Sequence, residues 1–172
     1  MKKQMYLEQL LSSYQSYFDI LKGVSLDGRD YAATATFHSR SEKYILVKKA
    51  QLWAMETNEY TYFSFADKLT LDEFSSLKDD VLANGFTKIK PHSEHMYSYI
   101  SMVIIADEVP EDVLRAIKKA KYHKKFMMSL QGWMDLRIAV LDVGRGKLYS
   151  NAKGKDMLPL MQDVLDSVAV TL

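Results

Sequence analysis

The chain has no cysteine, only three prolines and only seven glycines among its 172 residues. Without cysteine there is no disulfide, no thiolate metal site and no thiol nucleophile, so acid–base or metal chemistry would have to use histidine and carboxylate side chains. An excess of charge of one sign is missing as well, since 23 basic residues stand against 22 acidic ones. The net charge of +1 gives no global attraction to nucleic acid or to an anionic membrane, so a charged partner needs a local patch.

Long apolar runs are also absent from the sequence. The longest is Met102–Ala106, which is far shorter than the ~20 residues that span a bilayer. Lys2 and Lys3 are followed by Gln4 and Glu8, which interrupt the apolar segment that a secretory signal requires. We therefore expect a cytoplasmic protein with no membrane partner.

The composition that remains is that of a globular protein. Hydrophobic residues make up 48% of the chain and aromatic residues 12%, which is far from the composition of disordered proteins. A chain of this length is within the range of about 100–200 residues that is typical of one domain. We expect residues 1–172 to form a single α+β domain.

Periodicity predicts the order of the secondary-structure elements as αβββαβαββα. Helical spacing predicts a first helix that ends near Gly23, and the Thr70-Leu71-Asp72-Glu73 capping box begins a second that ends at Asn84-Gly85. Polar residues at 39–42 and 56–59 predict turns between strands. The fold class follows as α+β, with an antiparallel meander extended into a mixed sheet of about six strands and with helices packed on it. The remaining helices are predicted over 110–120 and 157–168, and the strands over 31–38, 44–55, 60–65, 97–106, 134–141 and 147–150.

Three short segments of the sequence resemble a known family. They are 40–44 (RSEKY), 91–96 (PHSEHM) and 132–137 (GWMDLR). The chain is similar in these segments to a small uncharacterised prokaryotic family of unknown function. The resemblance extends over most of the chain and implies no activity, so it assigns no catalytic residue.

A first candidate site is the His92-x-Glu94-His95 segment. Imidazole and carboxylate groups are ligands for zinc, manganese or iron at neutral pH. In an extended segment, however, His92 and Glu94 point to one side and His95 to the other. A metal site formed by His92, Glu94 and His95 and a solvated loop with local hydrogen bonds remain alternative interpretations.

A second candidate is the lysine-rich run at 118–125. Such a run can neutralise phosphates of a nucleic acid, and Tyr122 or Phe126 can stack on a base. Cations near a helix C-terminus are also favoured by the helix dipole, and the run contains no arginine for bidentate contacts. The residues predicted to bind nucleic acid in the first interpretation are Lys118, Lys119, Lys121, Lys124 and Lys125.

The opening order αβββαβ resembles the core of restriction-endonuclease-like nucleases. That resemblance implies a metal site with an acid at the start of the second strand, where Glu42 stands, and Glu-x-Lys on the third. The segment Glu59-Tyr60-Thr61 has no lysine, so the pattern is broken. Further along the chain, Asp135 and Arg137 share one face of a predicted strand, and we expect them to pair with each other.

The functional hypothesis from sequence is a non-catalytic domain that binds a protein partner or a second copy of itself. Tyrosine, tryptophan and methionine are enriched at protein interfaces, and Trp53 and Trp133 are the expected anchors. No dinucleotide fingerprint, P-loop or nucleophile elbow is present, and no cofactor is expected. The alternative is a nucleic-acid-acting or metal-dependent enzyme with a degenerate nuclease-like core.

Overall fold

The computed structural model describes the backbone of residues 2–45 and 50–171 and the side chains of residues 2–40 and 55–170. Within these ranges the chain forms four α-helices and one mixed sheet of seven strands. The predicted α+β class is therefore confirmed. The element order roughly matches the prediction, although a strand at Asp19–Leu26 replaces the end of the first predicted helix and a short strand is added within the lysine-rich run.

The strands lie in the order β1-β2-β3-β4-β6-β5. Strand β2 is antiparallel to both of its neighbours, β1 and β3, whereas β4 runs parallel to both of its neighbours, β3 and β6. The short strands β5 and β7 both pair with β6, at its beginning and at its end respectively. The strands are β1 (Asp19–Leu26), β2 (Arg29–Ile45), β3 (Ala50–Lys68), β4 (His95–Glu108), β5 (His123–Lys125), β6 (Trp133–Asp142) and β7 (Lys147–Ser150).

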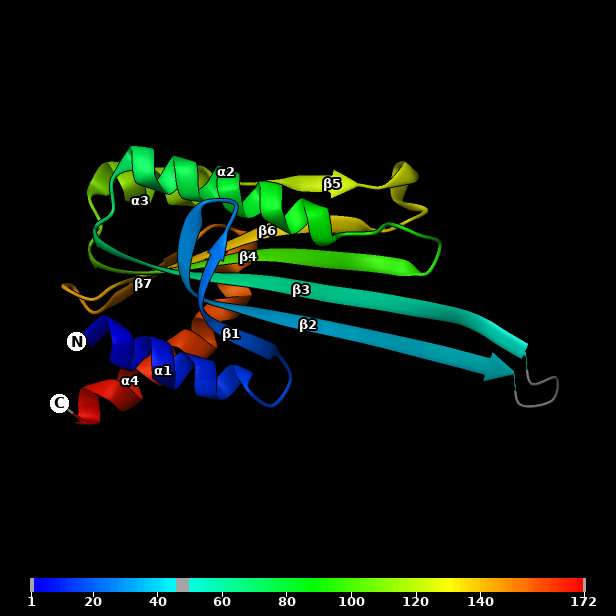
Figure 1. Cartoon of the computed structure of the whole chain (residues 1–172), viewed down its shortest axis with the longest axis horizontal. Coiled ribbons are helices and arrows are strands. Elements are labelled where there is room, and N and C mark those ends of the chain that lie inside the picture. The colour runs from blue at the N-terminus through cyan, green and yellow to red at the C-terminus, as the bar shows by residue number, and fades with distance from the viewer. Residues whose placement is uncertain (1, 46–49, 172) are drawn as a thin grey trace.

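Helices cover both faces of the sheet (Figure 1). Helices α1 (Lys2–Tyr14) and α4 (Leu158–Thr171) pack on one face, with α2 (Leu71–Lys88) and α3 (Glu111–Lys119) on the other. Each pair encloses its own apolar core against the sheet. Strands β2 and β3 project beyond the helices and beyond the end of β4, so one end of the sheet extends past both helical layers.

Strand β4 is the central strand that its apolar run predicts. Residues Met102–Ala106 are almost completely buried, because helices cover both faces of the sheet along this stretch. This buried stretch holds β4 in place and so positions the polar residues elsewhere on the strand.

Helix α2 begins as predicted but ends later. The Thr70 hydroxyl accepts a hydrogen bond from the backbone N–H of Glu73 at 3.2 Å, as in a capping box. The helix then continues through Gly85 to Lys88. A Cβ on Gly85 would lie 2.7 Å from Cδ1 of Ile100 on β4, so this glycine allows close helix–sheet packing and does not stop the helix.

The predicted boundaries in the first third of the chain are wrong. Helix α1 ends at Tyr14, and Leu21, expected on its buried stripe, is 63% exposed in strand β1. The predicted turns at 39–42 and 56–59 lie inside β2 and β3, which pair from Ala33 opposite Phe63 to Ile45 opposite Ala50. Polar residues there occupy a long ribbon that extends past the helices, and such residues produce the same sequence pattern as a turn.

Candidate binding surface

The face of the sheet that carries α1 and α4 is covered along only part of its length (Figure 1). Tyr97 and Tyr99, near the start of β4, lie on the same face of the sheet as the buried Val103. The Tyr97 ring stacks on Trp133 of β6, with ring centroids 5.9 Å apart, and lies 4.9 Å from the Tyr99 ring. All three side chains are partly exposed. We call Tyr97, Tyr99 and Trp133 the aromatic patch.

The aromatic patch continues into a charged pair at the centre of the sheet. Arg137 of β6 forms an ion pair with Glu59 of β3, and Ser101 of β4 lies between them. The Arg137 Nε donates to the Ser101 hydroxyl at 3.0 Å, and that hydroxyl donates to Glu59 Oε1 at 3.2 Å. The Thr61 hydroxyl donates to the same oxygen at 3.2 Å. The Tyr99 ring lies 4.3 Å from the Arg137 Cζ and so stacks on the guanidinium.

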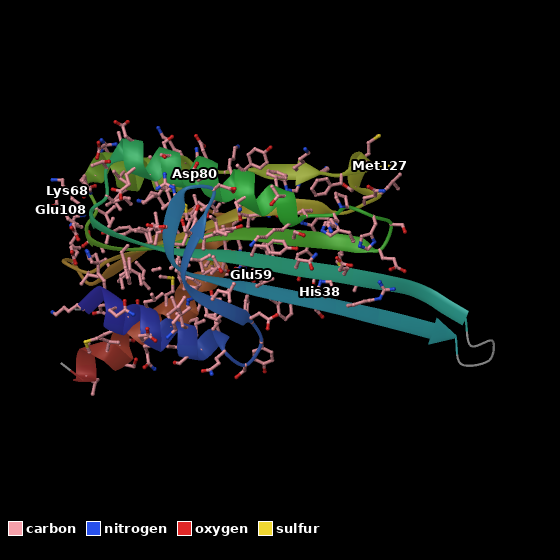
Figure 2. The ribbon with its side chains drawn as sticks, viewed as in Figure 1. His38, Glu59, Lys68, Asp80, Glu108 and Met127 are labelled. Atoms are coloured by element: carbon pink, nitrogen blue, oxygen red, sulfur yellow. The ribbon has the colours of Figure 1, made fainter. Side chains whose placement is uncertain are left out.

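A cleft of about 270 Å³ opens over this ion pair. Figure 2 labels Glu59 near the middle of the sheet. The cleft joins the end of α1, the sheet and the start of α4, so its walls combine apolar, aromatic and charged groups. The lining residues are Ser13, Tyr14, Tyr17, Phe18, Glu59, Arg137, Asp156, Met157 and Leu160.

Burial sets the protonation state of the phenols around this cleft. Burial raises the pKa of Tyr99, the neighbouring Tyr97 adds to the increase, and Arg137 opposes it. Burial likewise raises the pKa of Tyr14, with a further contribution from Glu59. Both phenols therefore remain neutral hydrogen-bonding groups at physiological pH.

The cleft offers hydrogen-bond donors and ring faces but no free general base among the groups described above. One oxygen of Glu59 already accepts from the hydroxyls of Thr61 and Ser101 and from Arg137, which leaves it poorly suited to act as a general base. The Arg137 Nη1 donates in no hydrogen bond within the described part of the chain. Its N–H groups, together with a stacked indole and two phenols, can hold the backbone carbonyls and apolar side chains of a ligand.

The histidines of the 92–95 segment lie on the other side of the sheet in a hydrogen-bonded network. His92 Nε2 donates to Glu56 Oε2 at 2.9 Å, and His92 Nδ1 accepts from the backbone N–H of Glu94 at 3.2 Å. The buried His95 Nδ1 donates to the carbonyl of Gln131 at 2.6 Å, and its Nε2 accepts from Ser98 at 2.8 Å. Both nitrogens of each ring are therefore already engaged.

Glu94 forms an ion pair with Arg40 at 2.5 Å. Among the residues whose side chains are described, no group of three or more histidine and carboxylate side chains is arranged to hold a metal ion. His38, further along the projecting strands in Figure 2, bonds to Asn58, which donates to Glu56 at 3.2 Å. Metal binding by His92, Glu94 and His95 stays a prediction.

The lysine-rich run is divided between two elements. Lys118 and Lys119 end helix α3, whereas Lys124 and Lys125 lie in strand β5, and all four are exposed. Lys124 Nζ lies 5.3 Å from the centre of the Phe86 ring and 5.8 Å from that of Phe126. Its stem therefore lies along apolar surface. Nucleic-acid binding at these lysines stays a prediction.

The other residues singled out from the sequence have different outcomes. Trp53 and Glu42 fall in strands β3 and β2, but their side chains lie outside the described ranges. The expected pairing of Asp135 with Arg137 is wrong, because Asp135 accepts a hydrogen bond from His123 at 2.7 Å and Arg137 pairs with Glu59. The sheet order, which brings β3 close to β6, could not be read from the local pattern.

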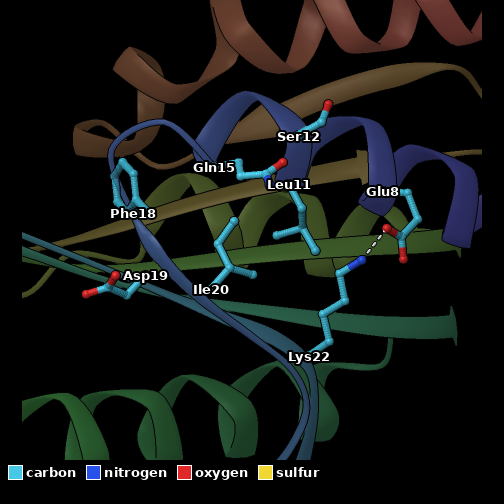
Figure 3. Close-up of a pocket in the computed structure, with 8 residues that line it drawn as sticks. All are labelled: Glu8, Leu11, Ser12, Gln15, Phe18, Asp19, Ile20 and Lys22. Carbon is cyan, nitrogen blue, oxygen red and sulfur yellow. Dashed lines mark hydrogen bonds and ion pairs between the residues drawn. The ribbon is translucent and has the colours of Figure 1, made fainter.

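A second cavity of about 450 Å³ lies between α1 and β1 (Figure 3). Leu11 and Ile20 form part of its wall, and the ion pair of Glu8 with Lys22 crosses it. The hydrogen bond from Lys22 lowers the pKa of Glu8. Both charged groups are about half exposed, so this cavity is a shallow surface groove with little to select a ligand.

Residues 2–162 match the model of a family described as Domain of unknown function (DUF8052). The chain belongs to this family. The predicted resemblance to a family of unknown function is thereby confirmed, and DUF8052 membership assigns no activity to any residue above. No curated protein and no solved structure matches the DUF8052 chain. Within its described residues, no helix combines the length and the apolar character needed to cross a bilayer.

Proposed function

We propose that this DUF8052 chain is a non-catalytic cytoplasmic binding module whose aromatic patch and adjoining cleft hold a segment of a protein partner. The observation that carries the proposal is the partly exposed Trp133, the first residue of β6, stacked on Tyr97 near the start of β4. Partly exposed tryptophan and tyrosine side chains on a rigid support are typical anchors of protein interfaces.

The arrangement of charge supports a protein ligand over a small anion. Arg137 is already neutralised by Glu59, and Asp156 lines the same cleft. A phosphate or carboxylate group would therefore enter a site with no net positive charge. A peptide offers carbonyl groups to Arg137 and the tyrosines and apolar side chains to the aromatic patch.

The competing function is a nucleic-acid-acting or metal-dependent enzyme with a degenerate nuclease-like core. The parallel pairing of β3 with β4 after an antiparallel meander supports it at the level of topology alone. The hydrogen bonds to Glu59 favour binding, because a metal ligand would have to lose Arg137 as its partner. Glu42, the other acid of that pattern, has no described side chain.

A photocrosslinking amino acid in place of Tyr97 tests the proposal in cells. The matched control replaces Tyr122, which is 40% exposed and packs against Phe86 on the opposite face of the sheet. We expect one protein to be crosslinked at Tyr97 and not at Tyr122, and the crosslink to disappear in Trp133→Ala. The same products at both positions, or none at Tyr97, would contradict the proposal.

A further inference from the structure

Strand β2 has a long free edge. Strand β1 pairs with it from Arg29 to Thr36, where the last partner is Asp19. From Phe37 to Ile45, β2 pairs with β3 along one edge. Along the opposite edge, which β1 occupies up to Thr36, no strand within the described ranges pairs with these residues. A free edge of this length presents unpaired backbone N–H and C=O groups to another strand.

The geometry of antiparallel pairing restricts how two copies of such an edge can meet. The two strands must be related by a two-fold axis perpendicular to the sheet, so one residue of β2 lies on the axis and faces its own copy. A residue that lies a given number of positions before the axis residue faces the residue that lies the same number of positions after it in the second copy. The choice of the axis residue therefore fixes all pairs.

Ser41 is the midpoint of the free edge from Phe37 to Ile45. With Ser41 on the axis, Arg40 faces Glu42 of the second copy, and the symmetry repeats this pair. Opposite charges directly across a strand pair are stabilising.

Other registers place unfavourable residues opposite each other. With Arg40, Glu42 or Lys43 on the axis, that residue faces its own copy and brings two like charges together. With Ser39 on the axis, Arg40 faces His38 and the last four residues of the edge remain unpaired. The charge pattern and the length of the paired edge together select Ser41 among the registers from 39 to 43.

The ion pair of Arg40 with Glu94 is compatible with the Ser41 register. The Arg40 Nη1 lies 2.5 Å from Glu94 Oε2, and 39% of the Arg40 side chain is exposed. A guanidinium carries five N–H donors, so a single carboxylate partner does not use all of them.

We propose that two copies of the chain associate through antiparallel pairing of strand β2 with its copy, centred on Ser41. The pairing joins the two sheets into one continuous sheet and satisfies the free edges of both strands. It does not involve the aromatic patch, so self-association through β2 and partner binding through Trp133 are separable properties.

Single cysteines test the register directly, because the natural chain contains no other thiol. In the Ser41→Cys variant the two thiols face each other, at a Cα separation of about 4.5–5.5 Å that allows a disulfide. In Ser39→Cys the two thiols are four residues apart along the strands, roughly 13 Å, which is too far. In a mixture of the Ser39→Cys and Lys43→Cys variants, the thiol at 39 of one chain faces the thiol at 43 of the other.

Under mild oxidation we expect a disulfide-linked dimer for Ser41→Cys and for the Ser39→Cys and Lys43→Cys mixture, but not for Ser39→Cys alone. Equal crosslinking of Ser41→Cys and Ser39→Cys would overturn the register.

Sedimentation of the unmodified chain supplies a second measurement. We expect a dimer that becomes a monomer in Glu42→Arg, returns in the Arg40→Glu/Glu42→Arg double variant and persists in Trp133→Ala. A chain that is monomeric at every concentration tested would overturn the proposal and would leave the binding role of the aromatic patch unaffected.

Discussion

Arg137 and Glu59 form an ion pair although their strands, β6 and β3, are not neighbours in the sheet. Strand β4 lies between them, and its Ser101 hydroxyl bridges the two charged groups. Only 10% of the Arg137 side chain and 14% of the Glu59 side chain are exposed. The pair thus supports the floor of the cleft and fixes the guanidinium on which Tyr99 stacks.

The Arg137→Ala variant should be strongly destabilised. It leaves the Glu59 carboxylate buried without its counter-charge, which costs about 3–5 kcal/mol in the free energy of unfolding. Replacing both residues, as Glu59→Leu with Arg137→Met, should cost less than Arg137→Ala alone, because no unpaired charge remains. Urea unfolding monitored by tryptophan fluorescence measures these differences.

The exposed pair of Glu8 and Lys22 is the control for that experiment. Its two side chains are about half exposed, so Glu8→Gln should change the free energy of unfolding by about 0–1 kcal/mol. An effect of Arg137→Ala as small as that of Glu8→Gln would show that the Glu59 charge is not buried in solution.

Gly85→Ala should destabilise the packing of α2 on β4. A new Cβ would lie 2.7 Å from Cδ1 and 2.8 Å from Cγ1 of Ile100, and overpacking of this kind costs about 1–3 kcal/mol. Since alanine favours a helix over glycine, the loss reflects the contact with Ile100. In the background of Ile100→Val, which removes Cδ1, Gly85→Ala should cost less. An equal cost in both backgrounds in thermal unfolding would contradict the close packing.

Acid should remove a stabilising contribution of Glu56. Burial acts to raise the pKa of Glu56, but hydrogen bonds from Asn58 and His92 outweigh it and hold the pKa below its ordinary value of 4.5. A carboxyl group with a lowered pKa stabilises the fold above its unfolded-state pKa, and this contribution is lost as the pH falls through the folded-state value. The excess stability of the natural chain over Glu56→Gln should therefore shrink below pH 4.5.

Urea titrations between about pH 7 and pH 3 measure this difference. The difference in the free energy of unfolding between the natural chain and Glu56→Gln could instead stay constant over the whole range. That result would mean that the hydrogen bonds from Asn58 and His92 do not stabilise the Glu56 carboxylate.

Local patterns in the sequence are sufficient for the helices and strands whose signals are strong. The capping box at Thr70 and the apolar run Met102–Ala106 each predict an element that the structure confirms. The patterns fail where tertiary packing decides, as at Gly85, which reads as a helix stop and lies inside α2 because Ile100 needs the space. They fail also in the long ribbon of β2 and β3, where polar residues at 39–42 resemble a turn.

The candidate surface follows from the sequence only in part. The residue type of Trp133 and its place beside a strand predict an anchor for a partner. No local pattern predicts Tyr97 and Tyr99 beside it, because the neighbourhood of β4 and β6 follows from the sheet order alone. The link between Glu59 and Arg137 spans 78 positions of sequence and leaves no local signal.

The affinity for the protein that crosslinks at Tyr97 tests the proposed function most directly. It can be measured by calorimetry with the purified partner for the natural chain, for Trp133→Ala and for the control Tyr122→Ala. We predict that Trp133→Ala weakens binding at least tenfold, about 1.4 kcal/mol, while Tyr122→Ala binds like the natural chain and all three unfold at similar temperatures. Equal affinities of the natural chain and Trp133→Ala would contradict the assignment of the aromatic patch as the binding surface.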